Sequence, residues 1–217
     1  MKKISTILFD LDGTLVDTAP DMAAALDDLC LEENREILPY HIVRPHVSNG
    51  SVALVKLAFG DNIDEATLDR LKDRYLQIYK GSIAKHSVLF DEMKDVLEHL
   101  EKNNIKWGVV TNKPGWLTLP LMQALKLEQR ASCIVSGDST ENRKPHPEPM
   151  HYACTLANCE PEECIYVGDA HRDIEAGNNA GMKTIIALYG YIDSDDDTAK
   201  WNANEVIQSP SEILNHL

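Results

Sequence analysis

The chain has 217 residues, 43% of them hydrophobic and 26% charged, so it can bury a core as one domain or one domain with an insert. Its 21 basic and 35 acidic residues give a net charge of −14, which argues against a nucleic-acid or anionic-membrane surface. No apolar run approaches the length of a membrane span and no signal peptide is evident, so we expect a cytoplasmic protein. The five cysteines are odd in number and form no C-x-x-C pair, which predicts reduced, mostly buried thiols rather than disulfides or a zinc site.

Short apolar runs recur along the chain and are typical of parallel strands that are covered on both faces. The first is TILFD, and the later runs are KWGVVTN at 106–112, CIVSGD at 133–138, CIYVGD at 164–169 and KTIIALY at 183–189. Helix-like segments lie between them, at roughly 91–103, 114–127, 148–158 and 171–181. This alternation of strand and helix predicts a doubly wound α/β sheet.

The stretch from Thr18 to His86 breaks this alternation, because its apolar residues recur at helical spacing over successive segments. Pro20 and the neighbouring acids are typical of the start of a helix. We therefore expect residues 18–86 to be an all-helical insert after the first strand. Residues 1–17 and 87–217 are expected to form the α/β core.

Polar residues follow several of the predicted strands, among them Asp10, Asp12, Thr111, Asn112 and Asp169. Ligands of such sheets bind beyond the carboxyl ends of the strands, where these residues would gather. Asp10 and Asp12 are two residues apart, so their side chains can point the same way in an extended segment. Two close carboxylates are tolerable when a divalent cation binds one and a proton sits on the other. An Asp-Gly turn with an incidental second acid is the alternative.

Four motifs at these strand ends resemble those of the haloacid dehalogenase (HAD) superfamily of phosphatases. DLDGTLVDT matches the first motif, D-x-D-G-T-[LV], and VVTN matches the second with Thr111. RKPHPEP matches the third with Lys144, and GDAHRD matches the fourth with Asp169 and Asp173. The motifs occur in the family's order across most of the chain. The resemblance implies a Rossmann-like, doubly wound parallel sheet with a small α-helical cap inserted after the first strand.

The resemblance also implies a Mg²⁺-dependent phosphatase in which Asp10 attacks phosphorus. The aspartyl-phosphate that forms splits one difficult step into two. Asp12 would protonate the leaving alkoxide and then deprotonate the hydrolytic water. Mg²⁺ would be held by Asp10, the backbone carbonyl of Asp12 and Asp169.

Further motif residues would assist this chemistry. Lys144 would offset the charge of the nucleophile and the phosphate, and Thr111 with the backbone N–H of Asn112 would bind a phosphate oxygen. Asp173 would support the site, sometimes through water. Each also has a plainer interpretation: a helix cap for Thr111, a solvated lysine for Lys144 and a first-turn acid for Asp173.

The helical insert resembles the small cap of the phosphoglycolate phosphatase and β-phosphoglucomutase branch. A cap that closes would exclude water and contact the leaving group. VSNGS at 47–51 lies where that branch often carries a substrate loop, which makes Ser48, Asn49 and Gly50 candidate substrate contacts. An ordinary Asn-Gly turn between cap helices is the alternative.

The expected partner is a small phosphorylated metabolite, with no nucleic acid and no membrane, and the oligomeric state stays open. VDTAPD resembles phosphoglycolate phosphatases, whereas HSVLFDEM, WGVVTNKP and YGYI also resemble bacterial N-acetylmuramic acid 6-phosphate phosphatases. Both substrates therefore remain alternatives. A dehalogenase would lack the acid at Asp12. A β-phosphoglucomutase-like phosphotransferase would keep all four motifs, and a non-catalytic phosphometabolite sensor would have lost at least one key residue, which this chain has not.

Overall fold

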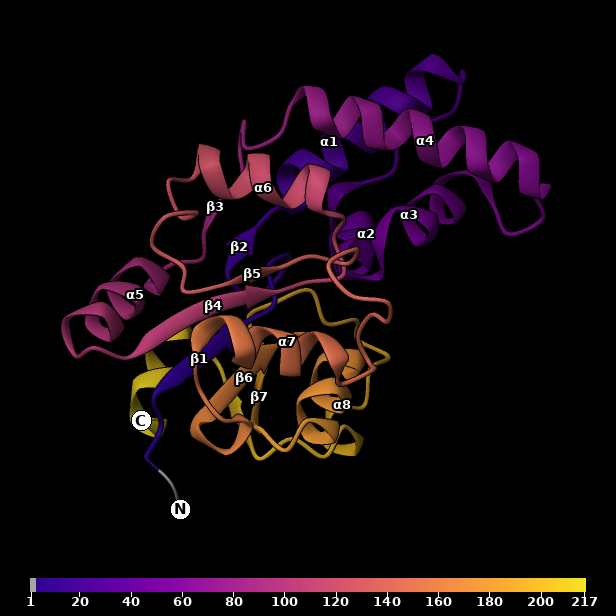
Figure 1. The fold of residues 1–217 in the computed structure, drawn as a ribbon. Helices are drawn as coiled ribbons and strands as arrows, with labels where there is room; N and C mark the ends of the chain where they lie inside the picture. Colours follow the sequence, from indigo (N-terminus) through magenta and orange to yellow (C-terminus); the bar gives the residue numbers. More distant parts are fainter. Residues whose placement is uncertain (1–2) are drawn as a thin grey trace.

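The apolar runs of the sequence form a six-stranded parallel sheet in the computed structural model, which describes residues 3–217 (Figure 1). The strand order is β5-β4-β1-β6-β7-β8, and every neighbouring pair is parallel. The strands are β1 (Thr6–Phe9), β4 (Lys106–Val110), β5 (Ile134–Val135), β6 (Cys164–Gly168), β7 (Lys183–Ala187) and β8 (Glu205–Ile207). The prediction of a Rossmann-like α/β sheet is confirmed.

Helices cover both faces of this sheet (Figure 1). They are α5 (Met93–Lys102), α6 (Gly115–Ala124), α7 (Glu148–Ala157) and α8 (His171–Asn179). Ile7 and Phe9 of β1 pack in one core with residues of α5 and α6, whereas Leu8 packs in another with residues of α7 and α8. Successive side chains of a strand point to opposite faces, so the unbroken apolar run of β1 suits a sheet that is buried on both sides.

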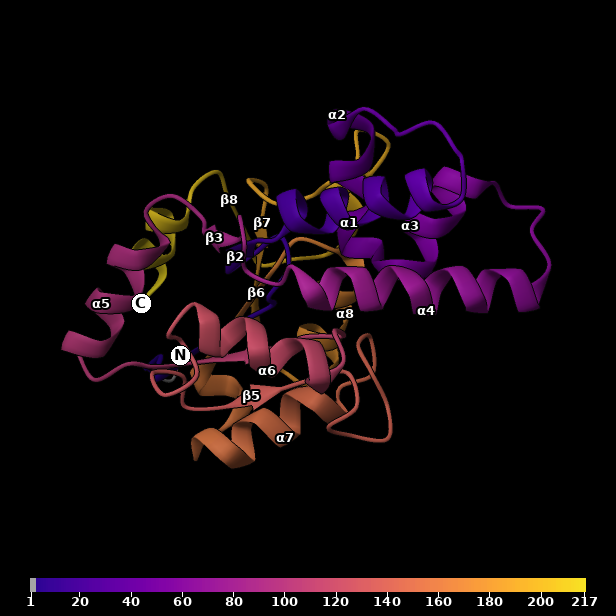
Figure 2. The same cartoon turned by 90° about the horizontal axis from the view of Figure 1, so that it is seen from above.

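The stretch expected to be a helical insert forms α1 (Ala19–Glu32), α2 (Tyr40–Val43), α3 (Gly50–Phe59) and α4 (Glu65–Gly81), with a 3₁₀ helix, η1 (Arg44–Asn49). We call residues 19–81 the cap. In α4, Leu71, Tyr75 and Tyr79 recur every four residues, so they share one face and are buried against α1 and α3. Figure 2 shows α1, α3 and α4 side by side and displaced from the sheet.

Two short antiparallel strands, β2 (Val16–Asp17) and β3 (Val88–Leu89), carry the chain into the cap and back. Asp21, buried in the first turn of α1, joins this connection to the cap. Its carboxylate accepts hydrogen bonds from the backbone N–H groups of His86 and Ser87 and from the Ser87 hydroxyl, at 2.6–3.0 Å. The limits predicted for the insert, 18–86, lie just inside this strand pair.

Three elements escaped sequence analysis: β2 and β3, of two residues each, and β8, which is too short for a periodic signal. The remaining helical turns are η2 (Pro161–Glu163), η3 (Thr198–Lys200) and η4 (Pro210–His216). The acidic run at 193–197 lies in the loop between β7 and η3.

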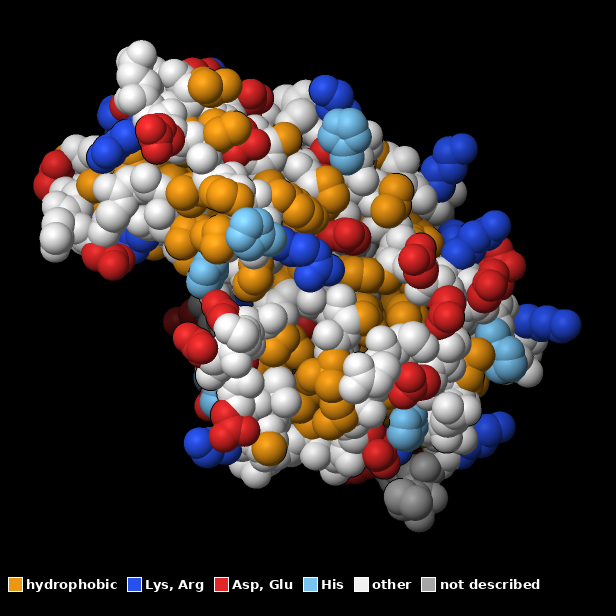
Figure 3. Space-filling model, turned by 180° about the vertical axis from the view of Figure 1, so that it is seen from behind, with side chains coloured by type: hydrophobic (Ala, Val, Ile, Leu, Met, Phe, Trp, Pro, Cys, Tyr) orange, Lys and Arg blue, Asp and Glu red, His pale blue; other side chains and the backbone are white. Residues whose placement is uncertain are grey.

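Acidic and basic side chains are interspersed on the face that Figure 3 shows, and its described residues form no continuous basic patch there. That surface agrees with the net charge of −14. Within residues 3–217, no helix combines the length and the apolar character needed to cross a membrane.

Candidate active site

The carboxylate that follows β1 meets a buried lysine. Lys144 Nζ lies 2.8 Å from Asp10 Oδ1 and 2.7 Å from Asp173 Oδ1, and all three side chains are at most 5% exposed. The same ammonium group donates to the backbone oxygen of Val110 and to the hydroxyl oxygen of Tyr166, each at 2.9 Å. One cation therefore balances two carboxylates that would be costly to bury alone.

Asp169, directly after β6, completes a group of three carboxylates. Asp10, Asp169 and Asp173 each offer an oxygen atom, and these atoms lie within 4.8 Å of one another. Burial raises the pKa of Asp169 to about 7, with a further rise from the two neighbouring carboxylates, although the Tyr191 N–H and the Ser48 hydroxyl act in the opposite direction. Excess negative charge on clustered oxygen donors is the arrangement that favours a hard divalent cation.

Two glycines allow the backbone to approach Asp169 closely. Gly13 has φ +86°, and a Cβ atom there would lie 2.2 Å from Asp169 Oδ2. A Cβ atom on Gly190 would lie 2.4 Å from both the Asp169 Cβ and the Gly13 oxygen. Thr14, the next residue in the first motif, donates from its hydroxyl to Asp169 Oδ1 at 3.0 Å. The D-x-D-G-T segment is thus fixed against the fourth motif.

Asp12 has a different set of neighbours. The Thr18 hydroxyl donates to its Oδ1 at 2.7 Å, and Lys113 Nζ lies 3.0 Å and 3.2 Å from its two oxygens. The Lys113 ammonium also lies 4.5 Å from the centre of the Tyr79 ring in the cap. Burial by itself disfavours the charge on Lys113, but Asp12 and Tyr79 together raise its pKa above the ordinary 10.5. Asp12 is therefore held by a hydroxyl and a permanent cation.

Thr111 and Asn112 directly follow β4. They line the cavity between the cap and the strand ends, which Asp10 and Asp12 also line. The Thr111 hydroxyl oxygen accepts the Lys113 N–H at 3.2 Å. The Asn112 side chain donates to the Lys144 carbonyl at 3.0 Å and accepts the Lys144 N–H at 3.1 Å. Asn112 therefore fixes the loop that carries the buried lysine.

The cap reaches the carboxylates through Ser48, near the end of η1. Its hydroxyl lies 2.8 Å from Asp169 Oδ2 and 3.3 Å from the backbone oxygen of Asp12. Arg172, in the first turn of α8, donates from its guanidinium to the Ser48 carbonyl. Ser48 is thus bound both to the core and to two groups predicted to hold a metal ion.

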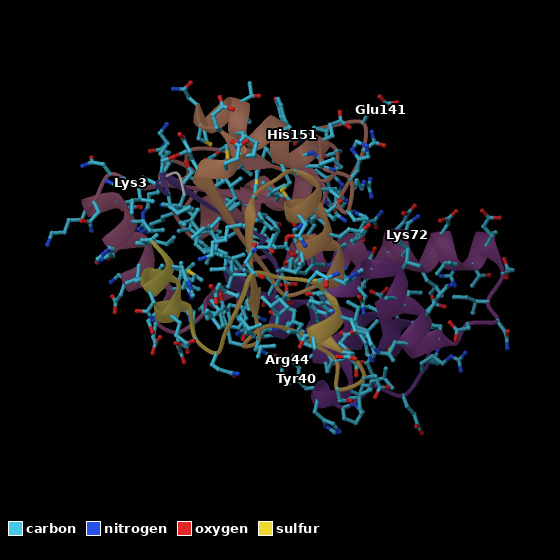
Figure 4. The ribbon with its side chains drawn as sticks, turned by 90° about the horizontal axis from the view of Figure 1, so that it is seen from below. Lys3, Tyr40, Arg44, Lys72, Glu141 and His151 are labelled. Carbon is cyan, nitrogen blue, oxygen red and sulfur yellow. The ribbon has the colours of Figure 1, made fainter. Side chains whose placement is uncertain are left out.

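Asn49 and Gly50 line the cavity between the cap and the strand ends, which has a volume of about 640 Å³. They join η1 to α3 and do not form an isolated turn, because Gly50, at φ +83°, begins the next helix directly. The cationic side chains on the cavity wall come from Lys72, Lys113, Arg143 and Arg172. Its apolar surface includes Met22, Val52, Leu76, Tyr79 and Leu117. Figure 4 shows Lys72 on α4 and Glu141 in the loop between β5 and α7, on the two sides of the boundary between cap and core.

The structure brings all the sequence-predicted site residues to one region. Asp10 is almost fully buried together with Lys144, Asp169 and Asp173, whereas Asp12 is partly exposed. Sequence analysis missed Lys113 and Arg172, although both stand next to or within matched motifs. Their side chains gain a role only through contacts with the first motif and the cap, which spacing alone does not reveal.

The chain belongs to the haloacid dehalogenase-like hydrolase family, whose sequence profile matches residues 7–187. It is 38% identical over 211 residues to an N-acetylmuramic acid 6-phosphate phosphatase of Pseudomonas putida, covering 97% of this chain and 95% of that protein. It is 37% identical over 207 residues to a phosphoglycolate phosphatase of Xanthomonas campestris, covering 95% and 93%. These findings confirm the resemblance to HAD phosphatases and the class of phosphoric monoester hydrolase.

A solved structure described as a predicted phosphoglycolate phosphatase from Haemophilus somnus superimposes with a TM-score of 0.88 at 28% sequence identity. The match covers 100% of this chain and 99% of the other. The arrangement of sheet and cap is therefore shared with that protein over its whole length.

Proposed function

We propose that this chain is a Mg²⁺-dependent phosphatase that hydrolyses a small phosphorylated metabolite through an aspartyl-phosphate on Asp10. One observation carries the proposal: Asp10 opens onto a cavity while Lys144 holds it from behind, and Asp12 lines the same cavity two residues further on. Phosphoryl transfer requires a positioned nucleophile and neutralised oxygens, and this arrangement supplies both.

The residues present fit a hard divalent cation. The carboxylates of Asp10 and Asp169 and the backbone carbonyl of Asp12 are all oxygen donors, which Mg²⁺ prefers. The Ser48 hydroxyl contacts both the Asp169 carboxylate and the Asp12 carbonyl, so these two acceptors already converge on one position. When bound there, Mg²⁺ would neutralise charge on the phosphate oxygens.

Asp173 is better suited to support the site than to bind the ion. One of its oxygens lies 2.7 Å from Lys144 Nζ, and the other accepts the Ala170 N–H at 3.0 Å. Lys144, held between Asp10 and Asp173, would keep the Asp10 carboxylate in place and reduce its repulsion of an incoming phosphate.

Asp10 would form a bond to phosphorus as the bond from phosphorus to the leaving oxygen breaks. Asp12 would act first in its protonated form, giving the proton to that oxygen, and then as the carboxylate beside Lys113, taking a proton from the attacking water. Thr111 and the backbone N–H of Asn112 would bind a phosphate oxygen at the end of β4. Lys113 and Thr18 would hold the Asp12 side chain in place between the two steps.

The cavity favours N-acetylmuramic acid 6-phosphate over 2-phosphoglycolate as the substrate. Its volume of about 640 Å³ suits a ligand larger than a two-carbon acid. Lys72 and Arg143 on its wall would complement the lactyl carboxylate of the amino sugar, and Leu76 and Leu117 would contact its acetyl group.

Phosphate release from a panel of phosphomonoesters, with and without Mg²⁺, tests the activity. The panel would hold both candidate substrates, hexose phosphates and nucleotides. Asp10→Asn is expected to abolish release. Asp138→Asn is a matched control beyond the end of β5, where the exposed carboxylate accepts the Gly115 N–H at 2.8 Å. Activity that survives in a folded Asp10→Asn variant would overturn the covalent mechanism.

Acid quenching with ³²P-labelled substrate tests the intermediate directly. Label should stay on the wild-type protein and on Asp12→Asn, in which hydrolysis of the aspartyl-phosphate lacks its base, and be absent from Asp10→Asn.

Substitution of Lys72 tests which leaving group the cavity binds. Lys72→Met should raise KM for N-acetylmuramic acid 6-phosphate about tenfold, as expected for the loss of about 1.4 kcal/mol. The KM for p-nitrophenyl phosphate, which has no carboxylate, should stay unchanged, and a preference for 2-phosphoglycolate would contradict the substrate assignment.

A further inference from the structure

Three cysteines meet at the end of the sheet opposite the active site. Cys154 lies near the end of α7, Cys159 in the loop that follows, and Cys164 at the start of β6. The three Sγ atoms all lie within 4.8 Å of one another. The Sγ atoms of Cys159 and Cys164 are 3.4 Å apart, and those of Cys154 and Cys164 are 3.8 Å apart. Asp169 stands five residues beyond Cys164, which is about 16 Å along an extended strand.

We propose that Cys154, Cys159 and Cys164 form a second metal site, which binds one thiophilic cation such as Zn²⁺ through three thiolates. A tetrahedral Zn²⁺ with Zn–S bonds of about 2.3 Å separates its sulfur ligands by about 3.8 Å. The two separations given above are close to this value. The third separation, between Cys154 and Cys159, is within 4.8 Å, so side-chain shifts of about 1 Å would bring all three sulfur atoms to the ligand positions.

The site is accessible from the surface. Cys154 and Cys159 line a shallow cavity of about 510 Å³, whose wall also includes His151, Glu160 and Glu163. Cys154 is buried, whereas Cys159 is partly exposed and marks the route by which an ion would enter. His151 precedes Cys154 by three residues on α7, so both lie on one face of that helix. Figure 4 shows His151 on the core, well away from Lys72 on the cap.

Charged groups of both signs surround the cluster, with Glu160 and Glu163 on the wall of the same cavity, where their carboxylates would attract a cation. Lys106 donates from Nζ to the backbone oxygens of Ala157 and Asn158, at 2.5 Å and 3.1 Å, and so places a positive charge beside the loop that carries Cys159. The thiolate is the form of cysteine that binds metals. Three sulfur donors select a soft ion, so this site and the all-oxygen site would take different metals.

Titration of the reduced, full-length protein with Cd²⁺ under anaerobic conditions tests the proposal. Cd²⁺ binding to thiolates produces an ultraviolet charge-transfer band, which should saturate at one ion per chain. Cys159→Ser should weaken binding at least about tenfold, since loss of a ligand exceeds the effect of losing a supporting contact. Cys30→Ser is the matched control, because Cys30 is a buried cysteine of α1 in the cap.

Zn²⁺ supplies a second readout that does not depend on the spectrum. It should raise the melting temperature of the wild type and of Cys30→Ser but leave that of Cys159→Ser unchanged. Mg²⁺-dependent phosphatase activity should persist in Cys159→Ser, which shows that the variant is folded. The proposal is wrong if the wild type binds no Cd²⁺, or if Cys30→Ser and Cys159→Ser weaken binding equally.

Discussion

Replacing Lys113 by methionine removes the cation that holds Asp12 while keeping most of the side-chain volume. The two side chains are 5% and 14% exposed, and their charged atoms lie 3.0 Å apart. Removing one partner of a buried ion pair costs about 3–5 kcal/mol, because the other charge is left without compensation. We expect a loss near the lower limit, about 3 kcal/mol, since Asp12 keeps its hydrogen bond from Thr18 and some contact with solvent.

The full effect is expected near neutral pH. Folding raises the pKa of Lys113 above 10.5, so its contribution to stability is complete below that value and disappears only as the pH rises through the folded-state pKa. Urea unfolding at about pH 7, followed by tryptophan fluorescence, therefore reports the whole loss.

The double variant Asp12→Asn/Lys113→Met separates the ion pair from general disruption. Its free energy of unfolding should fall by only about 1 kcal/mol, because replacing both partners leaves no unpaired charge. Lys200→Met is the control, because Lys200 pairs with Asp197 at 2.9 Å on the surface, where removal should change stability by less than about 0.5 kcal/mol. The reasoning is refuted if Lys113→Met is as stable as the wild type, or if the two single effects simply add.

Three further outcomes are expected. Burial raises the pKa of Asp169 to about 7, so its proton competes with Mg²⁺ below that pH. Calorimetric titration should therefore show tighter Mg²⁺ binding at about pH 8 than at about pH 6. Equal affinities at the two pH values would contradict this. Without metal, a carboxyl whose pKa is raised on folding makes stability fall as the pH rises from about 4 to about 7, which pH-dependent urea unfolding can check. Asp21→Asn should lower the free energy of unfolding by about 1.5–3 kcal/mol, because the charged hydrogen bonds from His86 and Ser87 are weakened. An unchanged urea midpoint would show that Asp21 does not fix the strand pair that joins the cap to the core.

The chemistry of the strand ends could be predicted from the sequence because parallel topology concentrates it. Asp10, Thr111 and Asp169 each follow an apolar run, and the carboxyl ends of parallel strands share one edge of the sheet. Helical periodicity likewise revealed the cap helices. The positions of these residues depend on local patterns and on a topological rule, whereas the roles predicted for Asp12, Lys144 and Asp173 depend on the resemblance of their motifs to those of HAD phosphatases.

Contacts between elements distant in sequence could not be predicted. Lys113, which follows β4, contacts Asp12, which follows the neighbouring strand β1, and it also contacts Tyr79 of the cap. No spacing of residues along the sequence predicts either contact. The cysteine cluster is similar, because its spacing matches no metal motif. It forms because Asn158, at φ +51°, ends α7 in a left-handed conformation and turns the chain back, so that Cys159 reaches the start of β6.

The contact of Ser48 with Asp169 and the Asp12 carbonyl links two equilibria. A cation that binds both oxygens competes with this hydroxyl, so ion binding and this attachment of the cap oppose each other. By thermodynamic reciprocity, the factor by which the ion loosens the cap equals the factor by which cap attachment weakens ion affinity. The concentration of free cation would therefore bias how often the Ser48 hydroxyl leaves these two oxygens, even before a substrate arrives, while Arg172 and Arg44 still join the cap to the core.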